Sequence, residues 1–80
     1  MEGRRLPDGF DDGLPSAGDF YRDVQGTWTA MTPNGLLANL RAHDVTEHDD
    51  ATITVSPSIL VRGHDRSWHG FLERGIWREC

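Results

Sequence analysis

Four histidines and one cysteine are the side chains of this sequence that bind metal ions most readily. His43 and His48 are five positions apart, as are His64 and His69, and Cys80 is the single cysteine. Zinc accepts imidazole nitrogen and thiolate sulfur from several converging ligands. The sequence has neither a Cys-x-x-Cys pair nor a His-Glu-x-x-His pattern, which bring such ligands together. We therefore predict no metal and no cofactor, and keep His64, His69 and Cys80 as the alternative metal-binding set.

Two acidic clusters beside histidines raise the alternative of hydrolytic chemistry. In His48-Asp49-Asp50 and in His64-Asp65, a carboxylate could orient an imidazole that acts as a general base. The serines that lie near them in sequence are Ser56, Ser58 and Ser67. Acids in hairpin turns usually accept hydrogen bonds from their own backbone, and a small core leaves little volume for a substrate pocket. We predict no catalytic residue, and a small hydrolytic domain remains the alternative.

The elements that position these residues are short strands separated by turn-forming residues. The first hairpin is predicted for Thr27–Leu40 around the turn Thr32–Gly35, because Pro at the second turn position and the Asn-Gly pair close such turns. In this hairpin Met31 should face Leu37. A helix over residues 36–42 is the competing interpretation, since its leucines also fit helical spacing.

A second hairpin is predicted for His43–Ser56. Its second strand alternates strictly, which directs Ile53 and Val55 inward. Pro57 must then lie at an edge, a bend or the start of a strand, because it has no backbone N–H to donate. Ile59–Val61 is predicted to be a short buried run.

The third hairpin is predicted for Trp68–Cys80 around Arg74-Gly75. If these two residues form the turn, strand pairing brings three pairs together: Leu72 with Trp77, Phe71 with Arg78, and His69 with Cys80. Alternation assigns Trp68, Gly70, Leu72 and Trp77 to the core. Phe71 and Arg78 lie on the opposite face and are predicted to contact a partner.

These signals predict an all-β domain over residues 26–80, a small antiparallel sheet of about five to seven strands with a barrel-like or sandwich-like core. Residues 1–25 are predicted to be a flexible acidic arm, because they combine Pro and Gly with six acidic residues and only three arginines. The aromatic residues of the arm, Phe10, Phe20 and Tyr21, are expected to bind a partner. At least two of the three tryptophans are expected in the core, because a small domain needs its large apolar side chains inside.

Composition and charge narrow the functional classes. A chain of 80 residues is long enough for one domain. The net charge of −5 does not favour sequence-independent binding to nucleic acid or to an anionic membrane. No apolar stretch has the length of a signal peptide or of a membrane span. We therefore expect a soluble cytoplasmic protein.

One combination of segments resembles a known family. Thr52–Ile59 contains a Pro-Ser-Ile strand, and Trp68–Leu72 followed by Gly75–Trp77 forms a Trp-His-Gly hairpin. Together these segments resemble small uncharacterised proteins of actinobacterial phages and prophages, over roughly Trp28 to Cys80. Ala51 departs from the glycine that the resemblance implies after the two acids of the turn. The resemblance implies origin and fold, and no activity.

The sequence therefore predicts a small non-enzymatic protein-binding module of phage or prophage type, which binds a host factor or a virion component. A protein partner is expected, and homo-oligomerisation is left open. The alternative function is a small His-based metal-binding or hydrolytic domain.

Overall fold

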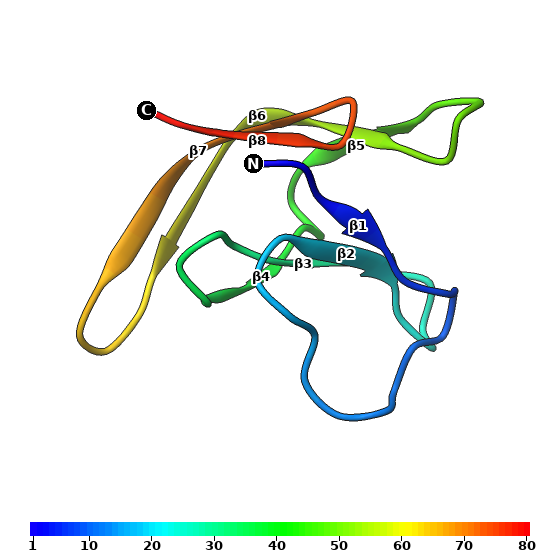
Figure 1. Ribbon diagram of the computed structural model, residues 1–80, viewed down its shortest axis with the longest axis horizontal. Coiled ribbons are helices and arrows are strands. Elements are labelled where there is room, and N and C mark those ends of the chain that lie inside the picture. The colour runs from blue at the N-terminus through cyan, green and yellow to red at the C-terminus, as the bar shows by residue number, and fades with distance from the viewer.

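The computed structural model describes residues 1–80 and is all-β. It contains two separate sheets of four strands each and no helix, and therefore no helix that could cross a membrane (Figure 1). The first sheet has the order β1-β2-β3-β4, with strands Arg4–Arg5, Asp19–Arg22, Trp28–Met31 and Leu37–Asn39. The second has the order β5-β6-β7-β8, with strands Asp44–Glu47, Ile53–Arg62, Ser67–Glu73 and Ile76–Glu79.

The β3–β4 hairpin has the predicted register, in which Met31 pairs with Leu37. Its turn is closed by Thr32, whose hydroxyl accepts a hydrogen bond from the Leu36 backbone N–H at 2.8 Å. Gly35 has a φ of 86°, a left-handed conformation that glycine adopts without steric cost. The competing helix over residues 36–42 is wrong, because pairing with β3 satisfies the backbone of this segment.

The β7–β8 hairpin also has the predicted register. Arg74 and Gly75 form its turn, with φ values of 46° and 77°, and Leu72 pairs with Trp77. Positive φ at both positions is the geometry of tight hairpin turns that match the twist of the flanking strands. Phe71 consequently pairs with Arg78, as the sequence predicts.

Strand β6 is longer than the sequence indicates, because it continues through Pro57 as a single strand. Its pairing with β7 shifts register between Val55 and Ile59, so the proline lies at an irregularity, as its missing N–H requires. Beyond this point the strand alternates: Ile59 is buried and Leu60 is exposed. The predicted buried run over Ile59–Val61 is therefore wrong for Leu60, because only every second side chain of a strand faces the core.

The core lies between the two sheets. Trp68 and Trp77 contact each other edge to face with ring centroids 5.2 Å apart, and the Trp77 indole N–H donates to the Gly18 carbonyl at 3.0 Å. The predicted burial of two tryptophans is confirmed, and Trp28 is half-buried and packs against the edge of the core cluster. The ten buried residues of the core cluster come from both sheets: Phe20, Ala30, Ala38, Leu40, Ile53, Val55, Ile59, Trp68, Leu72 and Trp77.

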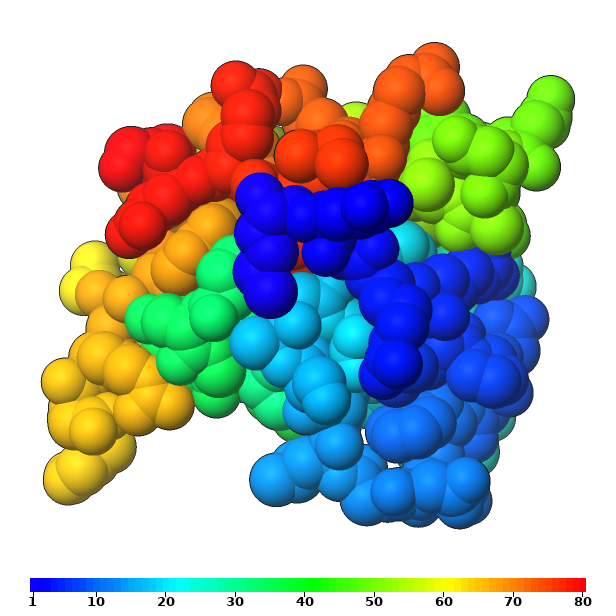
Figure 2. Space-filling view, viewed as in Figure 1, coloured from blue at the N-terminus to red at the C-terminus, as the bar shows by residue number.

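Residues 1–25, predicted to be a flexible arm, contribute to both sheets. The Gly3 N–H donates to the Gly75 carbonyl at 2.7 Å, and the Trp77 N–H donates to the Met1 carbonyl at 2.8 Å, so the first residues line the free edge of β8. The chain then enters β1, which pairs in parallel with β2. Figure 2 shows this segment lying across the boundary between the sheets. Strands from both sides of residue 25 therefore belong to the same sheet, and Phe20 belongs to the core at 1% exposure.

The connection from β1 to β2 lies against the outer face of the first sheet, the face turned away from the core (Figure 1). Tyr21, Thr29 and Met31 point to this face and are buried. The Phe10 ring packs edge to face on Tyr21, with centroids 5.2 Å apart. Asp19, also buried, accepts hydrogen bonds from Arg4 and from the Ser16 backbone N–H. Glycine and acidic residues here form ordered turns, which composition alone does not distinguish from disorder.

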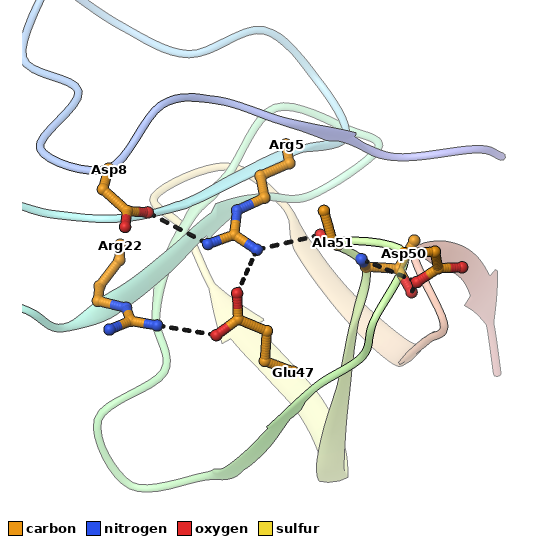
Figure 3. A network of polar contacts seen from close by, with 7 residues as sticks. Arg5, Asp8, Arg22, Glu47, Asp50 and Ala51 are labelled. Carbon is orange, nitrogen blue, oxygen red and sulfur yellow. Dashed lines mark hydrogen bonds and ion pairs between the residues drawn. The ribbon is translucent and has the colours of Figure 1, made fainter.

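A polar network joins the two sheets at the β5 edge (Figure 3). Glu47 accepts hydrogen bonds from Arg5 at 2.6 Å and from Arg22 at 3.0 Å. Both guanidinium groups also lie over the Trp28 ring, 5.1 and 4.8 Å from its centroid. The hydrogen bond to Glu47 is the main cause of a raised pKa for Arg5, whose partial burial opposes this shift. Arg5 also donates to the Ala51 carbonyl, so the network fixes β1 against the β5–β6 turn.

Candidate protein-binding surface

The outer face of the second sheet carries a group of outward-pointing side chains from three adjacent strands. Because directly paired residues of antiparallel strands point to the same side, the register identifies the members of this group. Leu60 pairs with His69, and Phe71 pairs with Arg78. We call this surface the β6–β8 face and define it by Leu60, His69, Phe71, Ile76, Arg78 and Cys80.

Three large apolar side chains of the β6–β8 face are exposed to solvent. The exposed fractions are 52% for Leu60, 37% for Phe71 and 43% for Ile76. The residues on the other side of the same strands, including Trp68, Leu72 and Trp77, are buried in the core. No other strand or connection packs over the β6–β8 face in Figure 1. A cluster of exposed apolar side chains rimmed by polar ones is typical of an interaction site.

Phe71 is held in place by its cross-strand neighbour. The Arg78 guanidinium carbon lies 5.6 Å from the Phe71 ring centroid, a cation–π distance. Arg78 also forms an ion pair with Glu73. These contacts restrict the side chains before any partner arrives, which lowers the entropy lost on binding.

His69 is the one histidine of the β6–β8 face. Its Nε2 lies 3.0 Å from the Ser58 hydroxyl and 3.9 Å from the Cys80 sulfur. The Cys80 backbone N–H donates to the His69 carbonyl at 3.0 Å, which completes the predicted pairing of these two residues. His64 lies apart, in the β6–β7 turn, and does not join them in a group of three metal ligands. No carboxylate contacts the His69 ring, so the orienting group of a catalytic triad is missing here.

The predicted binding residues therefore fall into two sets. Phe71 and Arg78 are adjacent and exposed on the β6–β8 face. Phe20 and Tyr21 are buried, and Phe10 is half-buried against Tyr21, so these three aromatics stabilise the fold in this structure.

Sequence reasoning missed Leu60 as a surface residue. Its position in an apolar run suggested burial, and only the pairing with His69 shows that it points outward. The signal that could have found it is the alternation that continues from Ile59, which requires Leu60 to face the opposite side.

The acidic turn between β5 and β6 forms a separate hollow of about 390 Å³, lined by Glu47, His48, Asp49, Asp50 and Arg74. The His48 ring nitrogen Nε2 lies 2.7 Å from the Thr54 hydroxyl, and no serine contacts this histidine. The Thr52 hydroxyl and backbone N–H both donate to Asp50, which lowers the pKa of that carboxyl below its ordinary value. The predicted cluster is thus a turn whose acid binds its own backbone, as such turns usually do.

Comparisons with protein-family models, with curated proteins and with solved structures find no match to this chain.

Proposed function

We propose that this protein is a small non-enzymatic binding module whose partner is another protein, and that it binds through the β6–β8 face. The observation that carries the proposal is the exposure of Leu60, Phe71 and Ile76 together on one uncovered sheet face. Burial of apolar surface contributes roughly 25 cal/mol per Å² to association, so these three side chains are the expected anchors.

The residues around the apolar centre support a specific complex. Arg78 and Phe71 are of the types enriched at binding hot spots. His69 and Ser58 add hydrogen-bonding groups at the rim. The resemblance of Thr52–Ile59 and Trp68–Leu72 to phage and prophage proteins supports a host factor or a virion component as the partner, with action in the host cytoplasm or in the virion.

A matched pair of double variants tests the proposal. The face variant carries Phe71→Ser and Ile76→Ser. The control variant carries Leu14→Ser and Val24→Ser, which are more exposed, at 83% and 71%, and belong to connections flanking β2 of the first sheet. All four positions are exposed, so both variants should fold, which circular dichroism and thermal unfolding will check.

Proteins retained from host lysate by the immobilised wild type and control, and lost with the face variant, are the expected result. Calorimetry with the purified partner should then show an affinity at least about tenfold lower for the face variant, a loss of about 1.4 kcal/mol. Equal binding by all three proteins would contradict the assignment of the β6–β8 face.

A further inference from the structure

A second hollow, of about 290 Å³, lies beside Trp28 where the first sheet meets β5. Its volume is close to the lower end of the range for small-molecule sites. Trp28, Leu40 and Val45 form its apolar wall. The remaining lining residues come from the β2–β3 turn and the β4–β5 connection: Gly26, Thr27, Arg41 and His43. The hollow is separate from the β6–β8 face and shares no residue with it.

Two side chains that line this hollow, Arg41 and Trp28, have hydrogen-bond donors without a partner in the protein. Arg41 is exposed and belongs to none of the ion pairs, so its guanidinium is free. The Trp28 indole N–H has no partner within the protein and is not among the buried unpaired groups. No Asp or Glu lines the hollow, although acids outnumber arginines in the chain. The hollow at the β5–β6 turn has the opposite character, because acids dominate its lining.

The walls of the hollow are held in place by contacts outside it. Arg5 and Arg22 lie over the Trp28 ring and are fixed by Glu47. The His43 nitrogen Nε2 is 3.1 Å from the Ser58 carbonyl oxygen, which only accepts, so Nε2 carries the hydrogen and donates it. A ligand therefore meets an ordered Trp28 and an ordered His43, and the binding entropy is lost mainly in ordering the exposed Arg41 side chain.

We propose that this hollow binds a small apolar carboxylate. The apolar group packs on Trp28, Leu40 and Val45, and the carboxylate accepts hydrogen bonds from the Arg41 guanidinium, with the Trp28 indole N–H as the second available donor. An arginine fork matches the two oxygens of a carboxylate, and a charged acceptor strengthens each bond. A cation finds no acidic side chain here, and a neutral ligand leaves the charge of Arg41 unpaired.

Three probes of the same shape and different charge test the proposal: phenylacetate, phenylacetamide and phenethylamine. Each is titrated into the uniformly ¹⁵N-labelled protein while amide and indole N–H shifts are recorded. We expect saturable shifts at the Trp28 indole and the Val45 amide with phenylacetate, and a Kd in the millimolar range for a ligand of this size. Phenylacetamide should bind about tenfold more weakly, and phenethylamine should cause no shift at these positions.

Variants of Arg41 separate its role from the apolar contact. Arg41→Gln should weaken phenylacetate binding about tenfold and leave phenylacetamide binding unchanged. Arg41→Glu should reverse the preference, so that phenethylamine binds instead. Arg62→Gln is the matched control, because Arg62 is also exposed and in no ion pair, and it should change nothing.

Three results would overturn the proposal: no saturable shift at Trp28 with phenylacetate, equal affinities for the carboxylate and the amide, or unchanged phenylacetate binding in Arg41→Gln. None of them bears on the protein-binding role of the β6–β8 face, which the face variant tests independently.

Discussion

The outer faces of the two sheets differ in what covers them. On the first sheet, the outward-pointing Tyr21, Thr29 and Met31 are 7–8% exposed, because the connection between β1 and β2 lies over them (Figure 1). On the second sheet, Leu60 and Phe71 also point away from the core, and they are 52% and 37% exposed. Both sheets therefore place apolar side chains on both faces. The first sheet buries most of its outer set, although Leu37, which pairs with Met31, is 50% exposed, and the second sheet leaves Leu60 and Phe71 exposed.

This difference in coverage arises because the long irregular segments of the chain pack on the first sheet. About a quarter of an 80-residue chain is needed to enter and cover the first sheet, which leaves only short turns for the second. An apolar outer face can be covered by the same chain or by another molecule. The comparison therefore supports the proposal that the β6–β8 face binds a partner, and the predictions below test how the two outer faces differ.

The largest expected effect is a difference in stability between truncating Tyr21, on the outer face of the first sheet, and truncating Phe71, on the outer face of the second. Tyr21→Ala should lower the free energy of unfolding by about 3 kcal/mol, because it removes a buried ring and leaves a cavity beneath the covering segment. Phe71→Ala should cost less than about 1 kcal/mol, the loss of a partly exposed ring and its cation–π contact. Urea denaturation of both variants measures the difference. Equal destabilisation would mean that the two outer faces are not differently covered.

A smaller effect tests whether the N-terminal segment is packed between the sheets. A Cβ at Gly3 would lie 2.9 Å from the Gly18 carbonyl oxygen, 3.0 Å from that of Gly75 and 3.1 Å from the Phe20 ring. Gly3→Ala should therefore destabilise the protein by about 1–3 kcal/mol through overpacking. Thermal and urea unfolding provide the measurement.

Glu2→Ala is the control for this substitution, because Glu2 is the exposed neighbour and its truncation removes no packing. It should change stability by less than about 0.5 kcal/mol. If Gly3→Ala were as stable as Glu2→Ala, the first residues would be the mobile arm that composition suggests.

The ion pairs between the sheets should contribute less. Glu47→Gln removes the charge that Arg5 and Arg22 share, and a partly exposed pair is worth at most about 1 kcal/mol. The loss should shrink at 1 M salt, where the Debye length is about 3 Å. Glu79→Gln, an exposed acid outside the ion pairs, is the control. A loss of stability that is larger than this and that salt does not reduce would show that these ion pairs are shielded from solvent.

The smallest effect concerns the acidic turn. Thr52→Val removes the hydroxyl that donates to Asp50, so the lowered pKa of this carboxyl should rise toward its ordinary value of 3.8. Because the folded-state pKa is the lower one, the contact stabilises the fold above pH 3.8 and this contribution is lost as pH falls through the folded-state value. A ¹³C titration of the carboxyl measures the shift, with Thr46→Val as control. An unchanged pKa would assign the shift to the backbone N–H of Thr52.

Local chemistry in the sequence determined the hairpins and their registers. The Arg74-Gly75 and Pro33-Asn34-Gly35 turns each define a pairing, and alternation then assigns every side chain of the strands to a face. This is why the exposed pair of Phe71 and Arg78, and the burial of Trp68 and Trp77, could be predicted without a structure.

Only the tertiary structure determined the packing of residues 1–25 against both sheets, the outward position of Leu60 and the hollow beside Trp28. Glycine, proline and aspartate occur in flexible segments and in ordered turns alike, and contacts such as Gly3 with Gly75 or Trp77 with Gly18 join residues too distant in sequence for any local pattern to reveal. The hollow likewise needs two turns and two sheets to bring Arg41 beside Trp28 and Val45. Local sequence determines which way a strand's side chains point, and packing between distant segments determines which of them remain exposed.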